Sequence, residues 1–124
     1  MSLKSYRDLK VWQRGMEIAE LCYKTTRKLP REEAFGGLIS QINRSSSRIS
    51  ANIAEGYGRG SRKEYLQFLR IANGSLKELE THLLLSSRVG LADPAEVDAI
   101  LVLCDEHGRM LLKLIRSLEG ANAS

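Results

Sequence analysis

The chain has 124 residues, a net charge of +4 at neutral pH and an isoelectric point near 9.3. This length supports one hydrophobic core, so we expect a single domain over residues 1–124. No apolar run is long enough to span a membrane, and the segment MSLKSYRDLK lacks the apolar part of a secretory signal. Cys22 and Cys104 form no CxxC motif, and we expect reduced, buried thiols in a cytoplasmic protein.

The first expected helix runs from about Tyr6 to Lys28 and ends before Pro30. One stripe at helical spacing is predicted to face the core, and it consists of Leu9, Trp12, Met16, Ala19, Tyr23 and Thr26. A second apolar stripe on a different side consists of Val11, Gly15, Ile18 and Cys22. In a small bundle every helix is peripheral, so this second face favours contact with another subunit in a closed homo-oligomer.

The second expected helix runs from about Glu32 to Glu55, with an inner stripe of Ile39, Ile42, Ser46, Ile49 and Ile53. Glycines follow at positions 56, 58 and 60, and basic residues come directly after them in the sequence. The segment has neither the strand and Gly-Lys-Ser/Thr ending of a phosphate-binding P-loop nor the G-x-G-x-x-G spacing of a dinucleotide site. We interpret it as a corner in which Gly56 or Gly58 adopts the left-handed conformation that ends the helix. Ser61 then caps the next helix, with Glu64 as its capping-box partner.

The third expected helix has a coiled-coil-like inner stripe of Tyr65, Leu69, Ala72, Leu76, Leu79 and Leu83, and Gly90 is expected to cap it. The fourth opens with Asp93-Pro94-Ala95-Glu96, an N-cap, a proline at the first helical position and a capping glutamate. Its inner stripe is Val97, Ile100, Cys104, His107, Leu111, Leu114 and Leu118, and Gly120 is expected to end it. Four helices with short links predict an all-α, up-down-up-down four-helix bundle.

The charge is unevenly distributed along the chain. Residues 1–77 contain 15 Lys and Arg against 7 Asp and Glu, whereas residues 78–124 contain 4 against 8. In the expected topology one end of the bundle, which we call the basic pole, collects Lys4, Arg7, Lys10, Arg14, Arg48, Arg59, Arg62, Lys63, Lys113 and Arg116. Its acidic residues are Asp8, Glu55, Glu64 and Glu119. Lys63, Arg70 and Lys77 also align along the third helix. The pattern is typical of a phosphate-binding surface, although charge alone is almost equally compatible with a solvated face.

Catalytic and metal-binding patterns are missing from the sequence. His82 and His107 are the only histidines, and neither lies in the Glu-x-x-His spacing of di-iron bundles. No cysteine or serine forms a recognisable nucleophile–base set, and Glu55 is expected to pair with Arg59 or Arg62. We therefore predict a non-enzymatic protein without a cofactor or a metal.

Three segments resemble a known family: DLKVWQRGMEIAELCY at residues 8–23, GLISQINRSSSRISANIAEGYGR at 37–59 and EYLQFLRIANGSLKELETHL at 64–83. They are similar to bacterial four-helix bundles encoded within intervening sequences of 23S rRNA genes. That family more distantly resembles the accessory variability protein of diversity-generating retroelements, a basic pentamer that binds nucleic acid and a reverse transcriptase. The resemblance implies a homopentameric ring without catalytic residues, and by matching position it carries over Arg44, Arg48 and Arg59 as basic sites.

Together these observations predict an oligomeric scaffold that binds nucleic acid, RNA in preference to DNA, through phosphate contacts with little sequence specificity. The expected contact residues are Arg7, Lys10, Arg14, Arg44, Arg48, Arg59, Arg62, Lys63, Arg70 and Lys77. The alternative is an adaptor whose main partner is another protein with an acidic surface. A small nuclease or transferase is the least favoured interpretation, because no general-base set is present.

Overall fold

The structure is a computed structural model, and it describes residues 5–122. The chain forms four long helices: α1 (Lys10–Thr26), α2 (Leu38–Gly58), α3 (Arg62–Arg88) and α4 (Pro94–Asn122). The 3₁₀ turns are η1 (Tyr6–Asp8), before α1, and η2 (Arg31–Glu33), between α1 and α2. Across residues 5–122 there is no strand, so the all-α prediction is confirmed. None of the described helices has the length and hydropathy needed to cross a bilayer.

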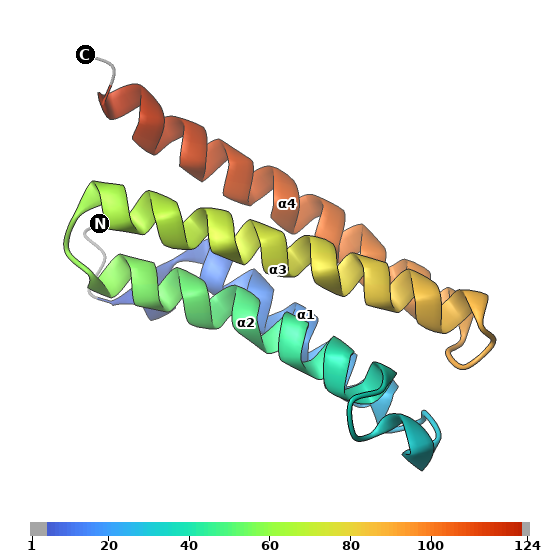
Figure 1. Cartoon of the computed structure of the whole chain (residues 1–124). Coiled ribbons are helices and arrows are strands. Elements are labelled where there is room, and N and C mark those ends of the chain that lie inside the picture. The colour runs from blue at the N-terminus through green and yellow to red at the C-terminus, as the bar shows by residue number, and fades with distance from the viewer. Residues whose placement is uncertain (1–4, 123–124) are drawn as a thin grey trace.

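The four helices form an up-down-up-down bundle, as predicted. α2 packs against α1 and α3, and α4 packs against α3 and α1, so each helix contacts two neighbours around one core. Figure 1 shows the start of α1, the α2–α3 corner and the C-terminal end of α4 at the same end of the molecule. That end is the basic pole, apart from Arg48, which was predicted there but lies in the middle of α2, and Lys4, which lies outside the described residues.

The core consists of branched aliphatic side chains from all four helices. Ile18, Ile42, Ile49, Ile53, Leu69, Leu76, Leu79, Leu83, Val97 and Leu111 are each no more than 2% exposed. Burying one such side chain contributes about 1.5–3 kcal/mol, so this set supplies most of the driving force for folding. The inner stripes predicted for α2, α3 and α4 are confirmed, including the fully buried His107.

The predicted inner stripe of α1 is wrong in part: Ala19 and Thr26 are buried and Leu9 and Trp12 pack against the core, but Met16 and Tyr23 do not. Met16 and Tyr23 are 38% and 43% exposed, whereas Ile18 and Cys22 of the second stripe are 1% and 0% exposed. The reason lies at Gly15, where an added Cβ would come within 2.3 Å of Ser50 Oγ on α2. Because the glycine side of α1 permits the closest approach, that side packs into the bundle and the Met16–Tyr23 side faces outward.

Two predicted helix starts are also corrected. α1 begins at Lys10 instead of Tyr6, because Ser5 caps the short η1 turn and the backbone is extended at Leu9. α2 begins at Leu38 instead of Glu32. Residues 31–33 form the separate η2 turn, the backbone then reverses at Gly36 with φ of 69°, and Glu33 Oε1 accepts the Leu38 N–H at 2.9 Å.

At the α2–α3 corner, the glycine that adopts the left-handed conformation is not one of the two that were predicted. Gly60, with φ of 85°, adopts the left-handed conformation, whereas α2 continues through Gly56 and ends at Gly58. Gly56 has a packing role, because a Cβ there would lie 2.6 Å from Phe68 Cβ on α3. The predicted cap is confirmed, since Ser61 Oγ accepts the Glu64 N–H at 3.2 Å.

The ends of α3 and α4 agree in part with the sequence. Gly90 has φ of 78° just after α3, and the Asp93 carboxylate accepts the Ala95 N–H at 3.0 Å, so both predicted caps are confirmed. Gly120 does not end α4, which continues to Asn122. A single glycine is tolerated in the last turn of a helix at a cost of only about 1 kcal/mol.

Candidate nucleic-acid interface

The basic pole brings together side chains from several segments. Arg7 and Lys10 come from η1 and the first residue of α1, Arg59 directly follows α2, and Arg62 and Lys63 open α3. All five are exposed (the pole is seen at the end of Figure 1 where the α2–α3 corner lies). The N-termini of α1 and α3 also point to this end, and each adds a partial positive charge.

Four of the ten predicted contact residues already have carboxylate partners. Arg59 pairs with Glu55 at 3.0 Å, as expected, reaches Glu64 at 3.7 Å and stacks over the Phe68 ring. The other pairs are Arg14–Glu17, Arg70–Glu119 and Lys77–Glu80. These pairs are exposed and contribute less than about 1 kcal/mol each, but a phosphate has to compete with the carboxylate for the cation.

A second group has no such competition. Lys10, Arg44, Arg48 and Lys63 are exposed, and none of them forms an ion pair with any described residue. Arg7 lies over the Tyr6 ring, with 5.7 Å between the guanidinium carbon and the ring centroid. These cations can meet an anion without first breaking an ion pair.

The structure does not gather all ten predicted residues into one patch. Arg44 and Arg48 lie one turn apart in the middle of α2, and Arg70 and Lys77 lie along α3 beyond its first turn. The ten residues therefore divide between a compact basic pole and the sides of α2 and α3.

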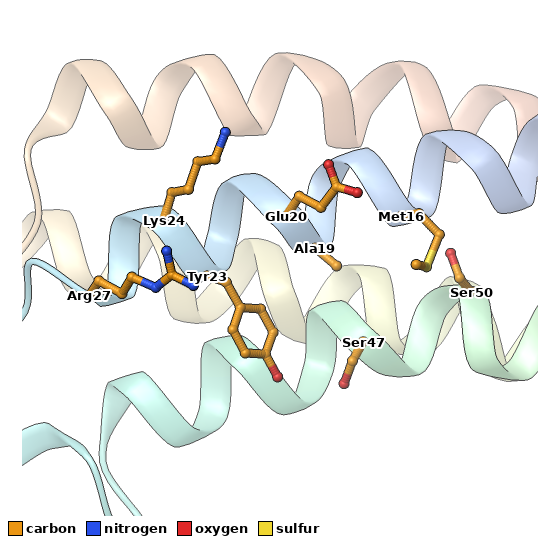
Figure 2. Close-up of a pocket in the computed structure, with 8 residues that line it drawn as sticks. All are labelled: Met16, Ala19, Glu20, Tyr23, Lys24, Arg27, Ser47 and Ser50. Atoms are coloured by element: carbon orange, nitrogen blue, oxygen red, sulfur yellow. The ribbon is translucent and has the colours of Figure 1, made fainter.

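An outward groove between α1 and α2 was not predicted. It has a volume of about 470 Å³ and is lined by Met16, Ala19, Glu20, Tyr23, Lys24, Arg27, Ser47 and Ser50. Figure 2 shows the Tyr23 ring extending from α1 towards α2, and Met16 beside Ser50. The signal for this groove was present in the sequence, because its apolar floor belongs to the stripe that we assigned to the core.

The buried nucleophilic and imidazole groups serve packing. Burial raises the pKa of the Cys22 and Cys104 thiols to about 12, so both stay protonated at neutral pH. His107 is fully buried, its Nε2 lies 2.8 Å from the Val11 carbonyl oxygen, and burial lowers its pKa. Among the described residues no three His, Cys, Asp or Glu side chains lie close enough to hold a metal ion.

Residues 7–113 match the family model of the 23S rRNA-intervening sequence protein. The chain belongs to this family. A crystal structure from Bacteroides thetaiotaomicron, described as a protein with unknown function from the S23 ribosomal protein family, is also similar. The two share 27% sequence identity with a TM-score of 0.77, over 85% of this chain and 97% of that chain. No curated protein matches the chain significantly.

Proposed function

We propose that this member of the 23S rRNA-intervening sequence protein family is a non-enzymatic, oligomeric scaffold that binds nucleic acid, RNA in preference to DNA, at its basic pole. One observation supports the proposal: Lys10 and Lys63 are exposed cations, each at the N-terminus of a long helix, and neither forms an ion pair with a residue that the structure describes. A helix N-terminus and a lysine together favour a phosphate group. The family name, which refers to rRNA, supports RNA as the ligand.

Binding of this kind depends on phosphate contacts. Lysine and arginine side chains displace condensed counterions from the nucleic acid, so the affinity falls steeply as the salt concentration rises. Arg48, on the outward side of α2, extends the cationic surface away from the basic pole. Several copies in one assembly would multiply weak phosphate contacts through effective concentration.

The test is a salt titration of binding to a fluorescein-labelled RNA hairpin, followed by fluorescence anisotropy from about 50 to about 200 mM salt. We expect the Lys10→Ala/Lys63→Ala variant to bind more weakly and to reduce the slope of log K against log salt by about 2. The matched control is Arg31→Ala/Arg88→Ala, which removes two exposed cations at the opposite end of the bundle that have no ion pair within residues 5–122. It is expected to change the slope much less. Equal effects of the two variants would show that the basic pole is not the binding surface.

Affinity capture before and after nuclease treatment distinguishes the RNA-binding scaffold from the protein-binding adaptor. A scaffold for RNA loses its captured partners when RNA is digested. Protein partners that remain bound after digestion would favour the adaptor.

A further inference from the structure

The groove between α1 and α2 is an apolar surface without a partner in the described chain. Its floor consists of Met16, Ala19 and Tyr23, and Ser47 and Ser50 form the wall on α2. The lining residues of α1 run from Met16 to Arg27, which corresponds to about 16 Å of helix. This length matches three turns of an α-helix, so the groove is suited to one face of another helix.

The charged residues at the groove indicate which kind of helix would be complementary to it. Lys24 and Arg27 line it and form no ion pair among residues 5–120, and Glu20 is the one carboxylate among the lining residues. Figure 2 shows the Lys24 side chain extending from α1 on the side away from α2, whereas the Arg27 side chain lies along the end of α1. A complementary helix has a narrow apolar ridge with carboxylates beside it.

α4 carries such a ridge on its outer side. Ala95, Ala99 and Val102 follow one another at four- and three-residue spacing, all three are exposed, and Val102 is 59% exposed. Asp98 lies beside the ridge and Glu106 continues it one turn further on; both are exposed and form no ion pair with a described residue. The two alanines keep the ridge narrow, which lets its backbone approach a groove closely.

The groove and the ridge lie at the same height along the bundle. Lys28, one residue beyond the groove lining and just past the end of α1, forms an ion pair with Glu96 in the first turn of α4. A second copy can therefore present its ridge to the groove with its bundle axis parallel to that of the first. Because the groove and the ridge are different surfaces, the contact is head-to-tail, and repeating it places every basic pole on one side of the assembly.

We propose that α4 of a second copy docks its Ala95–Ala99–Val102 ridge into the α1–α2 groove, with Asp98 facing Lys24 and Arg27. This inference rests on the proposed oligomeric scaffold and names the two surfaces that build it. The occupant comes from this chain because the basic half, residues 1–77, is complementary in charge to the acidic half, residues 78–124.

The experiment uses sedimentation velocity at micromolar concentration with two charge-reversed variants. Lys24→Glu/Arg27→Glu damages the groove, and Asp98→Lys/Glu106→Lys damages the ridge. Each variant alone is expected to sediment as a monomer. An equimolar mixture is expected to assemble beyond a dimer, because the wild-type groove meets the wild-type ridge and the two charge-reversed surfaces are also complementary. Combining all four substitutions in one chain is expected to restore the wild-type assembly.

Circular dichroism establishes that each variant is folded, and Arg88→Glu serves as a control for a charge reversal outside both surfaces. If the wild type assembles and either variant assembles equally well, the docking proposal is overturned while the oligomeric scaffold stands. The same holds if the mixture remains monomeric. A monomeric wild type overturns both the docking proposal and the oligomeric part of the proposed function, and the RNA titration then decides nucleic-acid binding separately.

Discussion

His107 joins α4 to α1 through a single enclosed polar contact. Its Nε2–H donates to the Val11 carbonyl oxygen at 2.8 Å, and its Nδ1 is buried without a hydrogen-bond partner. The charged side chains that line a small cavity together with His107 are Arg14 and Glu17 of α1 and Glu106 of α4. From α2 the hydroxyl of Ser50 faces the same region, and it carries no charge. Burial therefore dominates and lowers the pKa of His107.

We expect acid to destabilise the fold through His107. The unfolded chain takes up the proton near the ordinary pKa of 6.5, and the folded chain does so only at lower pH. Unfolding then binds a proton, so the free energy of unfolding falls as the pH drops below about 6.5. His107→Gln is expected to cost about 1–3 kcal/mol at neutral pH and to flatten this dependence. Urea unfolding between about pH 7 and about pH 5 measures both effects. A slope that persists in His107→Gln, with His82→Gln as the comparison, would assign the pH dependence to other groups.

Gly56 sets how closely α2 and α3 pack. Gly56→Ala would place a Cβ 2.6 Å from Phe68 Cβ, so the two helices have to move apart. We expect a loss of about 1–3 kcal/mol in the free energy of unfolding. Gly74→Ala is the matched control, because Gly74 lies within α3 and an added Cβ there meets no atom within 4 Å. The control is expected to stabilise the protein by up to about 1 kcal/mol, and chemical denaturation compares the two.

At the scale of the element, α1 has two apolar stripes, and the one containing Ile18 is in the core. Ile18→Ala is expected to cost about 2–5 kcal/mol, because it opens a cavity at a side chain that is 1% exposed. Met16→Ala, at a side chain that is 38% exposed, is expected to cost less than about 1 kcal/mol.

Both substitutions are to be measured in the Lys24→Glu/Arg27→Glu background, where assembly through the groove no longer contributes to stability. Equal losses at the two positions would mean that Met16 supports the fold of the single chain. That outcome would contradict an outward-facing Met16 side chain.

At the scale of the whole molecule, one variant changes assembly and net charge at the same time, and these two changes have opposite effects on the affinity for RNA. Asp98→Lys/Glu106→Lys makes each chain more basic, which by itself strengthens binding to RNA. It also separates the copies, which removes the gain from several basic poles acting together. We expect the second effect to dominate on a long RNA and to weaken binding by about a hundredfold. Anisotropy with a long and a short RNA separates the two effects, because a short RNA reaches a single basic pole. Tighter binding of this variant to the long RNA would contradict the multivalent scaffold.

Much of the fold could be predicted because helix spacing, capping residues and short links are local properties. Ser61, Asp93 and Gly90 mark helix ends through contacts within a few residues, and all three were predicted correctly. The helix starts at Lys10 and Leu38 were missed because 3₁₀ turns use the same residue types as a first helical turn. In the candidate site, exposure of the basic residues followed from their type, but their ion-pair partners depend on neighbouring helices, as in Arg70–Glu119.

The sequence by itself determined the number of helices, their order and the basic pole, because these follow from periodicity and from charge along the chain. Only the tertiary structure decided which face of α1 is buried. Two stripes satisfy the same helical period, and the choice between them depends on how closely α2 can approach at Gly15. That choice leaves Met16 and Tyr23 on the surface and creates the groove beside Lys24 and Arg27. A pattern within one helix cannot encode this outcome, since it is a property of two helices in contact.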